Sequence, residues 1–349
     1  MQREDLAMQN LPLTPQTEIS CYQFYVFPYA ILYTLPEYRD YLAEHYLQCF
    51  GYVPDYISHI NFGYADGVGY NDMFYDSGPL DIVFHSYALG FQLDIKQYIV
   101  SSIDSDSYIV VFVDEYYIEG RPSYQTNHRL HDMLIYGYDD ENFNYFVFDR
   151  SPSFLSFPKN QLCDAYRFGR STFMSSEEKV IWVDGKSIVS LKPKPMQSPY
   201  IFSVNRFARN LESYLNGEFS VSYSSFVIPK EKCHIGVYNT NLLKHYVDNT
   251  IKNAYITYPA VHAWYESKRN LLSKIKYCYD KANLENSKLI SDYETEVRQQ
   301  AERVRLSFLK YDRNGQLNRS GISPLLGGIV NSERSIVGSI YNELNHHIR

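Results

Sequence analysis

Residues 128–149 read HRLHDMLIYGYDDENFNYFVFD and predict an antiparallel β-hairpin. Apolar, aromatic and β-branched side chains fill 133–136 and 145–148 and flank the polar turn DDEN, an arrangement typical of two paired strands. His131 stands just before the first strand run and Asp149 just after the second. A histidine and an aspartate are therefore expected at the same open end of the hairpin.

The length of the turn decides whether these two residues face each other. If residues 139–141 close the turn, strand partners have numbers that sum to 280, and His131 lies opposite Asp149 with Cβ atoms roughly 5 Å apart. If residues 139–142 close it, His131 faces Arg150 and Asp149 points to the other side of the sheet. The sequence permits both registers.

Cys21 is the cysteine best placed to complete a Cys–His–Asp set. It immediately precedes an aromatic, apolar run that is typical of a buried helix. A thiolate at a helix N-terminus is stabilised by the helix dipole and by a neighbouring imidazolium. Taken singly, such residues are more often a small core cysteine, a capping histidine and a turn aspartate. Their order along the chain favours a joint catalytic interpretation, with Cys233, next to His234, as the one rival nucleophile.

Composition narrows the classes of function that fit the chain. It has 349 residues, a net charge of −7 and 5 cysteines that are widely scattered, without CxxC or HExxH. This argues against a disulfide framework or structural zinc and for a reducing cytoplasm. The N-terminus has no apolar segment typical of a secretory signal, no long apolar run predicts a membrane span, and no basic arm suggests nucleic acid.

The chain is expected to form two domains, 1–191 and 192–349, divided by the proline-rich break KPKPMQSP. The first predicts an α+β fold, with an antiparallel sheet and an N-terminal nucleophile helix interrupted near Pro28 and Pro36. Its strand at 109–113 is continuously apolar, as a central strand would be. The second domain predicts mainly helices, at residues 201–216, 239–255, 259–311 and 329–347.

Three segments together resemble a known family. The helix start at Cys21, the text VDEYY at 113–117 and the hairpin at 128–149 are similar to papain-like cysteine acyltransferases related to bacteriocin-leader peptidases. That family includes the acyltransferase of butirosin biosynthesis and the thiotemplated amide synthetase of closthioamide biosynthesis. The resemblance implies a papain-like first domain in which Cys21 is the nucleophile, His131 the base and Asp149 the third member.

The residues around Cys21 depart from the peptidases of this family. Those peptidases carry a glycine directly after the nucleophile and an oxyanion glutamine six positions before it, whereas this chain has Tyr22 and, five positions before, Gln16. We expect Gln16 to act as oxyanion donor together with the Cys21 backbone N–H. The aromatic residues Tyr22, Phe24 and Tyr25 are candidates for lining the substrate pocket, and ordinary core packing explains them equally well.

The resemblance implies an acyl transfer without ATP or metal, because the acyl donor is an activated thioester on the phosphopantetheine of a carrier protein. Cys21 takes the acyl or peptidyl group and an amine or diamine accepts it, the acyl chain being by resemblance a β-alanine oligomer. A basic patch is expected to dock the acidic carrier protein. Its candidates are Lys186, Lys192, Lys194, Arg206 and Arg209. The alternatives are a peptidase or thioesterase of the same fold and a non-catalytic binding module; the oligomeric state is left open.

Overall fold

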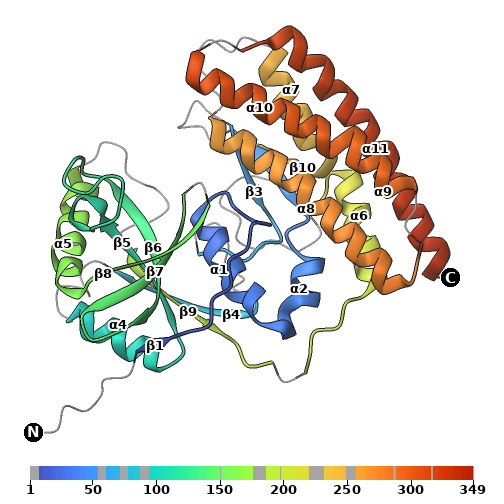
Figure 1. The fold of residues 1–349 in the computed structure, drawn as a ribbon. Coiled ribbons are helices and arrows are strands. Elements are labelled where there is room, and N and C mark those ends of the chain that lie inside the picture. Colours follow the sequence, from blue (N-terminus) through green and yellow to red (C-terminus); the bar gives the residue numbers. More distant parts are fainter. Residues whose placement is uncertain are drawn as a thin grey trace, which may run out of the picture. The chain divides into compact units, whose positions relative to one another are not determined.

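The computed structural model of the chain forms two compact units (Figure 1). The sheet unit comprises residues 1–36 and 68–197, and the helical unit comprises residues 37–67 and 198–349. The structure describes residues 8–53, 60–70, 78–86, 94–149, 151–175, 186–196, 198–219, 232–248, 257–285, 288–315 and 317–348.

The assignment of residues 37–67 corrects the predicted domain boundary. The chain leaves the sheet unit at 197/198, inside the predicted proline-rich break, but 37–67 also belong to the helical unit. They contain α2 (Arg39–Glu44), β2 (Cys49–Tyr52) and β3 (Asn61–Tyr64), and β2 pairs with β10 (His234–Ile235). Pairing over such a sequence separation leaves no local signal, so the pattern along the chain did not reveal it.

An antiparallel sheet forms the core of the sheet unit and confirms the α+β class. Its strand order is β4-β9-β5-β6-β7-β8, and β1 pairs with β6. As predicted, the apolar strand β5 is central, and Ile109, Val110 and Val111 are fully buried. The strands are β1 (Gln9–Asn10), β4 (Leu80–Ser86), β5 (Tyr108–Asp114), β6 (Leu130–Tyr138), β7 (Asn142–Phe148), β8 (Pro152–Pro158) and β9 (Lys186–Pro193).

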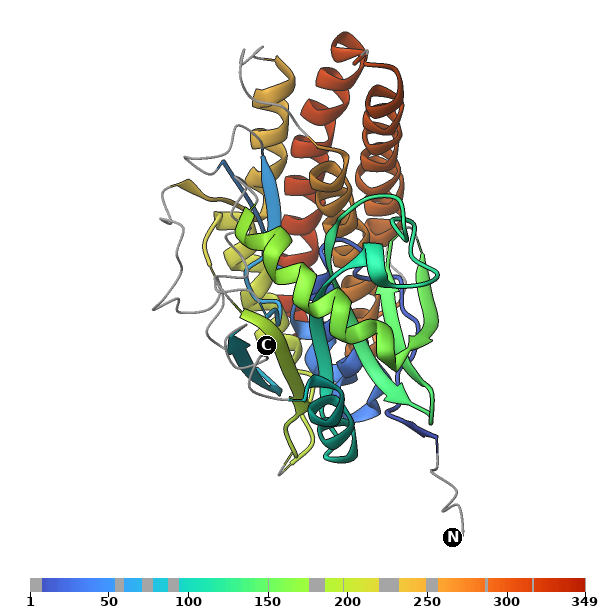
Figure 2. The same cartoon turned by 90° about the vertical axis from the view of Figure 1, so that its left-hand side faces the viewer.

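Three of the described helices pack on this sheet: α1 (Gln23–Thr34), α4 (Ile95–Asp104) and α5 (Lys159–Ser175). In the view of Figure 2, α5 lies across the strands of the sheet. The α4 helix begins where the Asp94 side chain accepts hydrogen bonds from the N–H groups of Lys96 and Gln97. The sequence patterns did not predict α5.

Pro28 lies inside α1 and does not interrupt it, contrary to expectation. Proline lacks the N–H that would bond the carbonyl four residues earlier, which here belongs to Phe24. The backbone N–H of Tyr70 donates to this carbonyl at 3.3 Å instead. Gly69 permits the approach, since a Cβ at this position would lie 3.3 Å from the same oxygen. A tertiary contact thus satisfies the carbonyl that Pro28 leaves without its helical partner.

The hairpin of β6 and β7 combines both registers considered above. Next to the turn, Tyr138 pairs with Phe143, as a four-residue turn requires. A bulge between Ile135 and Gly137 then restores the other register, and Leu134 pairs with Phe146 and Ile135 with Tyr145. These partners sum to 280, but the paired ladder ends at Leu134 and does not reach His131.

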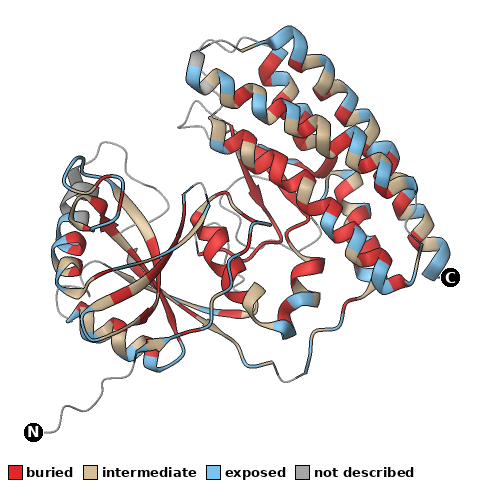
Figure 3. Cartoon of the chain, viewed as in Figure 1, coloured by how far each residue is buried: buried red, intermediate tan, exposed pale blue. Residues whose placement is uncertain are grey.

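The helical unit is built around α8 (Tyr258–Ala282), which is buried along most of its length (Figure 3). The single long helix predicted at 259–311 is wrong, because Asn283 adopts a left-handed conformation with φ of 51° and ends α8. The chain continues as α9 (Lys288–Tyr293), a π-helical turn (Glu294–Arg298) and α10 (Gln299–Asn314). The other helices of this unit include α6 (Val204–Asn216), α7 (Asn239–Asp248) and α11 (Arg319–Ile348).

A buried ion pair joins the helices of this unit. The Lys268 ammonium donates to the Glu333 carboxylate at 2.9 Å, and both side chains are fully buried. The hydroxyls of Tyr214 and Tyr293 donate to the other carboxylate oxygen at 2.7 and 3.0 Å. The pair is therefore fully hydrogen-bonded, as buried charges require. Among the described helices, none is both long and apolar enough to cross a membrane.

Candidate active site in the sheet unit

The loop that carries Cys21 is held by Gln16. The Gln16 side chain donates to the Ile19 carbonyl at 2.8 Å and accepts from the Ile19 N–H at 3.0 Å. Gln16 and Ile19 are both buried. The amide predicted as an oxyanion donor is thus engaged in the turn that leads to Cys21, so its evident role here is to order the loop.

Tyr22 connects Cys21 to α1 in a conformation that favours glycine. Its φ is 64° and its ψ 107°, and it is the N-cap of α1. Its carbonyl accepts the first helical hydrogen bonds, from Tyr25 and Val26 at 2.9 and 3.1 Å. A non-glycine residue in such a conformation costs about 1–3 kcal/mol. The position at which the resembled peptidases have glycine therefore also has a glycine-like backbone here, although tyrosine occupies it.

The three aromatic residues predicted to line a substrate pocket differ in burial. Tyr25 is completely buried and Phe24 nearly so, and their rings contact each other at a centroid distance of 4.5 Å. Tyr22 is partly exposed and stacks on Phe24 at 5.4 Å. Phe24 and Tyr25 therefore belong to the core, and only Tyr22 presents an appreciable part of its ring to solvent.

His131 on β6 contacts the start of α1. His131 pairs with Val113 of β5 in the strand ladder. The Gln23 side-chain nitrogen is 3.1 Å from Nε2 of the His131 ring and 3.3 Å from its Nδ1. Gln23 is the first residue of α1, so the Cα of Cys21 lies at most about 7 Å further along the chain. This contact brings the predicted base and the segment of the predicted nucleophile together. The Gln23 Oε1 is buried and has no hydrogen-bond partner among the described residues.

A buried carboxylate, Glu115, lies behind the His131 ring. Glu115 begins the 3-10 turn η2 (Glu115–Tyr117) that follows β5, and its Oε1 is 3.3 Å from His131 Nδ1. The same oxygen accepts from Arg121 Nε at 2.7 Å and from a second guanidinium nitrogen of Arg121. Both side chains are almost completely buried. A carboxylate in this position favours a proton on Nδ1 and leaves Nε2 as the acceptor nitrogen.

Asp149 bonds Arg121 and not His131, the residue that one of the two hairpin registers would place opposite it. Its carboxylate accepts from Arg121 at 2.9 and 3.2 Å, and no hydrogen bond or ion pair joins it to His131. Burial alone would raise the pKa of Asp149, but hydrogen bonding and charge from Arg121, with a smaller contribution from His131, lower it overall. The paired ladder ends before these residues, and the guanidinium draws the carboxylate to itself.

Gln23, Glu115 and Arg121 are the residues of this site that sequence reasoning missed. Glu115 lies within the segment VDEYY at 113–117, on which the family resemblance partly rests, but nothing in the sequence indicated a role for it. Gln23 could have been found as the first helical residue after Cys21, while Arg121 follows an irregular turn and carried no signal.

The remaining sequence candidates lie elsewhere or are already engaged. Cys233 and His234 belong to the helical unit, whereas Cys21, His131 and Asp149 belong to the sheet unit. The described basic candidates for docking include Lys192, which donates to the Ser105 carbonyl at 2.6 Å, and Arg206, which pairs with Glu44 at 2.7 Å. These cations are already bonded within the chain.

Comparison with known proteins finds no protein-family model and no curated protein that matches this chain. Among the described residues, no group of three or more His, Cys, Asp or Glu side chains is arranged to hold a metal ion. None of the five cysteines forms a disulfide. The assignment of function therefore depends on the residues around His131.

Proposed function

We propose that this chain is a papain-like cysteine acyltransferase that transfers an acyl group from a carrier-protein thioester to an amine. The observation that carries the proposal is the contact between Gln23 and His131. It joins the start of the helix that follows Cys21 to an imidazole on the neighbouring sheet, and a carboxylate lies behind that imidazole. Papain-like catalysis needs this combination of a thiol at a helix start and an oriented histidine.

In the first step, the Cys21 thiolate attacks the carbonyl carbon of the thioester. A carbon–sulfur bond forms to Cys21, the bond to the phosphopantetheine sulfur breaks, and the departing thiolate takes a proton from the His131 imidazolium. In this proposal, backbone N–H groups at the start of α1 stabilise the oxyanion, each typically contributing roughly 3 kcal/mol. Gln16 orders the loop for this attack.

In the second step, an amine attacks the acyl–Cys21 thioester. His131 accepts a proton from the amine nitrogen, the Cys21 thiolate departs, and an amide is released. The buried Gln23 Oε1, which has no partner among the described residues, is a suitable acceptor for an N–H of the incoming amine. In a peptidase or thioesterase of the same fold, water attacks the acyl–Cys21 intermediate in place of the amine. Only the acceptor therefore distinguishes a hydrolase from an acyltransferase.

Within this mechanism Glu115 orients His131 and Asp149 acts through Arg121. Glu115 is fully buried and lies next to Nδ1, whereas the Asp149 side chain is 34% exposed and bonds the guanidinium. The Arg121 guanidinium bridges the two carboxylates. We therefore assign the role of third member, which the resemblance gave to Asp149, to Glu115.

Intact-mass spectrometry tests the proposal. The protein is incubated with an acyl-pantetheine thioester, and we expect a mass increase of one acyl group that is absent in Cys21→Ala. Addition of an alkylamine should then release the amide faster than water releases the acid. An adduct on Cys233 would identify this residue of the helical unit as the nucleophile, and predominant release of acid would indicate a hydrolase.

A non-catalytic binding module is the second candidate, and the burial of Cys21 favours it. Only 7% of Cys21 is exposed, which is typical of a structural cysteine. The same experiment separates the two, because a binding module forms no acyl adduct on any cysteine. For the acyltransferase, the burial implies that the residues around Cys21 rearrange when the pantetheine arm enters.

A further inference from the structure

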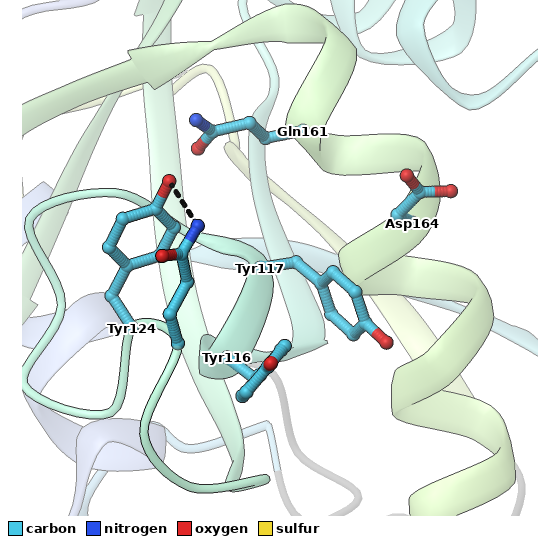
Figure 4. A pocket seen from close by; sticks show the side chains of 6 residues that line it. Tyr116, Tyr117, Tyr124, Gln161 and Asp164 are labelled. Carbon is cyan, nitrogen blue, oxygen red and sulfur yellow. Dashed lines mark hydrogen bonds between the residues drawn. The ribbon is translucent and has the colours of Figure 1, made fainter.

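Glu115 of the turn η2 contacts His131, and the other two residues of this turn line a cavity of about 400 Å³. Tyr116 and Tyr117 of η2, Tyr124 and Gln125 of the following loop, and Gln161 and Asp164 of α5 surround it. Figure 4 shows these side chains around the cavity, with Gln161 and Asp164 extending from α5. The volume is within the range of small-molecule sites, about 300–1,000 Å³.

Ring contacts hold the tyrosines of this cavity in place. Tyr116 stacks on His128 at a centroid distance of 4.4 Å and meets Tyr117 nearly edge-on at 5.0 Å. Tyr117 also stacks on Phe168 of α5 at 4.9 Å. The wall is therefore a fixed aromatic surface, and aromatic surfaces of this kind attract cations through the negative faces of their rings.

Fixed polar groups complete the cavity and give it a negative charge. Gln161 is held by the Glu119 N–H at 2.9 Å, and the Gln125 amide donates to the Tyr124 hydroxyl at 3.2 Å. Among the lining residues that the structure describes, Asp164 is the one that carries a charge, and its carboxylate is exposed and forms no ion pair with a described residue. Burial, followed by the charges of carboxylates that include Asp164, raises the pKa of Tyr117.

We infer that this cavity binds a primary alkylammonium group between the tyrosine rings and the Asp164 carboxylate. None of the lining residues that the structure describes is Lys or Arg, so an anion finds no counter-charge among them, whereas an ammonium finds both a carboxylate and aromatic faces. Glu115 contacts His131, and the next two residues, Tyr116 and Tyr117, line the cavity. On the basis of the proposed function, the cavity is a subsite for amine-bearing substrates.

Ligand-detected NMR with n-butylamine at pH 7 tests the inference, in Cys21→Ser protein so that no acyl transfer contributes. We expect saturable binding with a dissociation constant on the order of 1 mM. Asp164→Asn and Tyr117→Leu should each weaken it about 3- to 10-fold, whereas Tyr117→Phe should retain it because the ring remains. Asp140→Asn, in the exposed hairpin turn, is the matched control.

The outcomes separate this inference from the proposed function. Equal binding of butylamine and the neutral 1-butanol, or equal binding by Asp164→Asn and the control, would overturn the ammonium site. Butylamine binding in a protein whose Cys21 is never acylated would support the ammonium site and refute the acyltransferase proposal. Acylation of Cys21 without butylamine binding would support the acyltransferase and refute the ammonium site.

Discussion

The Gln23 side-chain nitrogen lies 3.1 Å from Nε2 of His131, so the first residue of α1 touches the nitrogen that we propose as the base. The Glu115 carboxylate lies 3.3 Å from the other ring nitrogen, Nδ1. The two contacts define the orientation of the imidazole between a helix start and a buried carboxylate. The amide must give way, or share its hydrogen bond, when a substrate proton reaches Nε2.

Replacing Gln23 with alanine should slow acylation of Cys21 about 10-fold, because the His131 ring then loses a polar contact that orients it. The rate is measured by intact mass as a function of time with an acyl-pantetheine thioester. Gln97→Ala is the control, since Gln97 is exposed on α4 and should react at the wild-type rate. An unchanged rate in Gln23→Ala would show that this contact has no part in the chemistry.

Glu115→Gln should lower the acylation rate more than Asp149→Asn does. We expect a loss of at least about 10-fold for Glu115→Gln, which removes the charge next to Nδ1 but keeps an acceptor for Arg121, and about 3-fold or less for Asp149→Asn. Rates are compared under identical conditions by intact mass. The reverse order would restore Asp149 as the direct partner of His131.

Glu115→Ala should also destabilise the sheet unit strongly, by about 3–5 kcal/mol, because it leaves the Arg121 guanidinium buried without its main partner. Asp149→Ala should cost less, since the Asp149 side chain is partly exposed. Urea unfolding, monitored by far-ultraviolet circular dichroism, gives both free energies. Similar losses in the two variants would mean that the guanidinium is held equally by both carboxylates.

Tyr22→Gly should be more stable than Tyr22→Ala by roughly 1 kcal/mol, because only glycine adopts a positive φ without steric cost. Both variants lose the ring and its stacking on Phe24, so the comparison isolates the backbone at φ 64°. At a helix-flanking position with an ordinary negative φ, the alanine variant would be at least as stable as the glycine variant. Thermal unfolding of the two variants measures the difference, and a more stable alanine variant would refute the strain.

The stability of the helical unit should fall as the pH decreases from about 6.5 to 4. Burial, followed by the charges of Arg305 and Arg269, lowers the pKa of His262 to about 4. Because this folded-state value is below the unfolded one, the unfolded chain binds a proton first, and the loss approaches about 3 kcal/mol near pH 4. Above pH 6.5 the residue has no such effect.

Urea unfolding at pH 7 and pH 4.5, followed by Trp264 fluorescence in a Trp182→Phe background, measures this loss. Trp264 is fully buried in α8 and reports on the helical unit. His262→Gln should lose less stability between the two pH values, whereas His346→Gln, a change at an exposed histidine of α11, should behave like the parent. Equal losses in His262→Gln and the parent would exclude His262 as the cause.

The sequence by itself determined the local secondary structure of the sheet unit and the position of His131 at the open end of the hairpin. Two runs of apolar and aromatic residues on either side of an acidic turn indicated the β6–β7 hairpin. A continuous apolar run indicated the central strand β5, and the apolar sequence after Cys21 indicated α1. Each of these signals depends on neighbours within a few residues, so it can be read along the chain. The proline-rich break likewise marked the passage into the helical unit.

Only the tertiary structure decided which groups meet. It placed Glu115 rather than Asp149 beside His131, paired Asp149 with Arg121, joined residues 37–67 to the helical unit, and supplied Tyr70 to the carbonyl that Pro28 leaves open. The reason is that a buried charge or carbonyl takes the partner that the packed chain brings within reach. That partner is far away in the sequence, where no periodicity points to it.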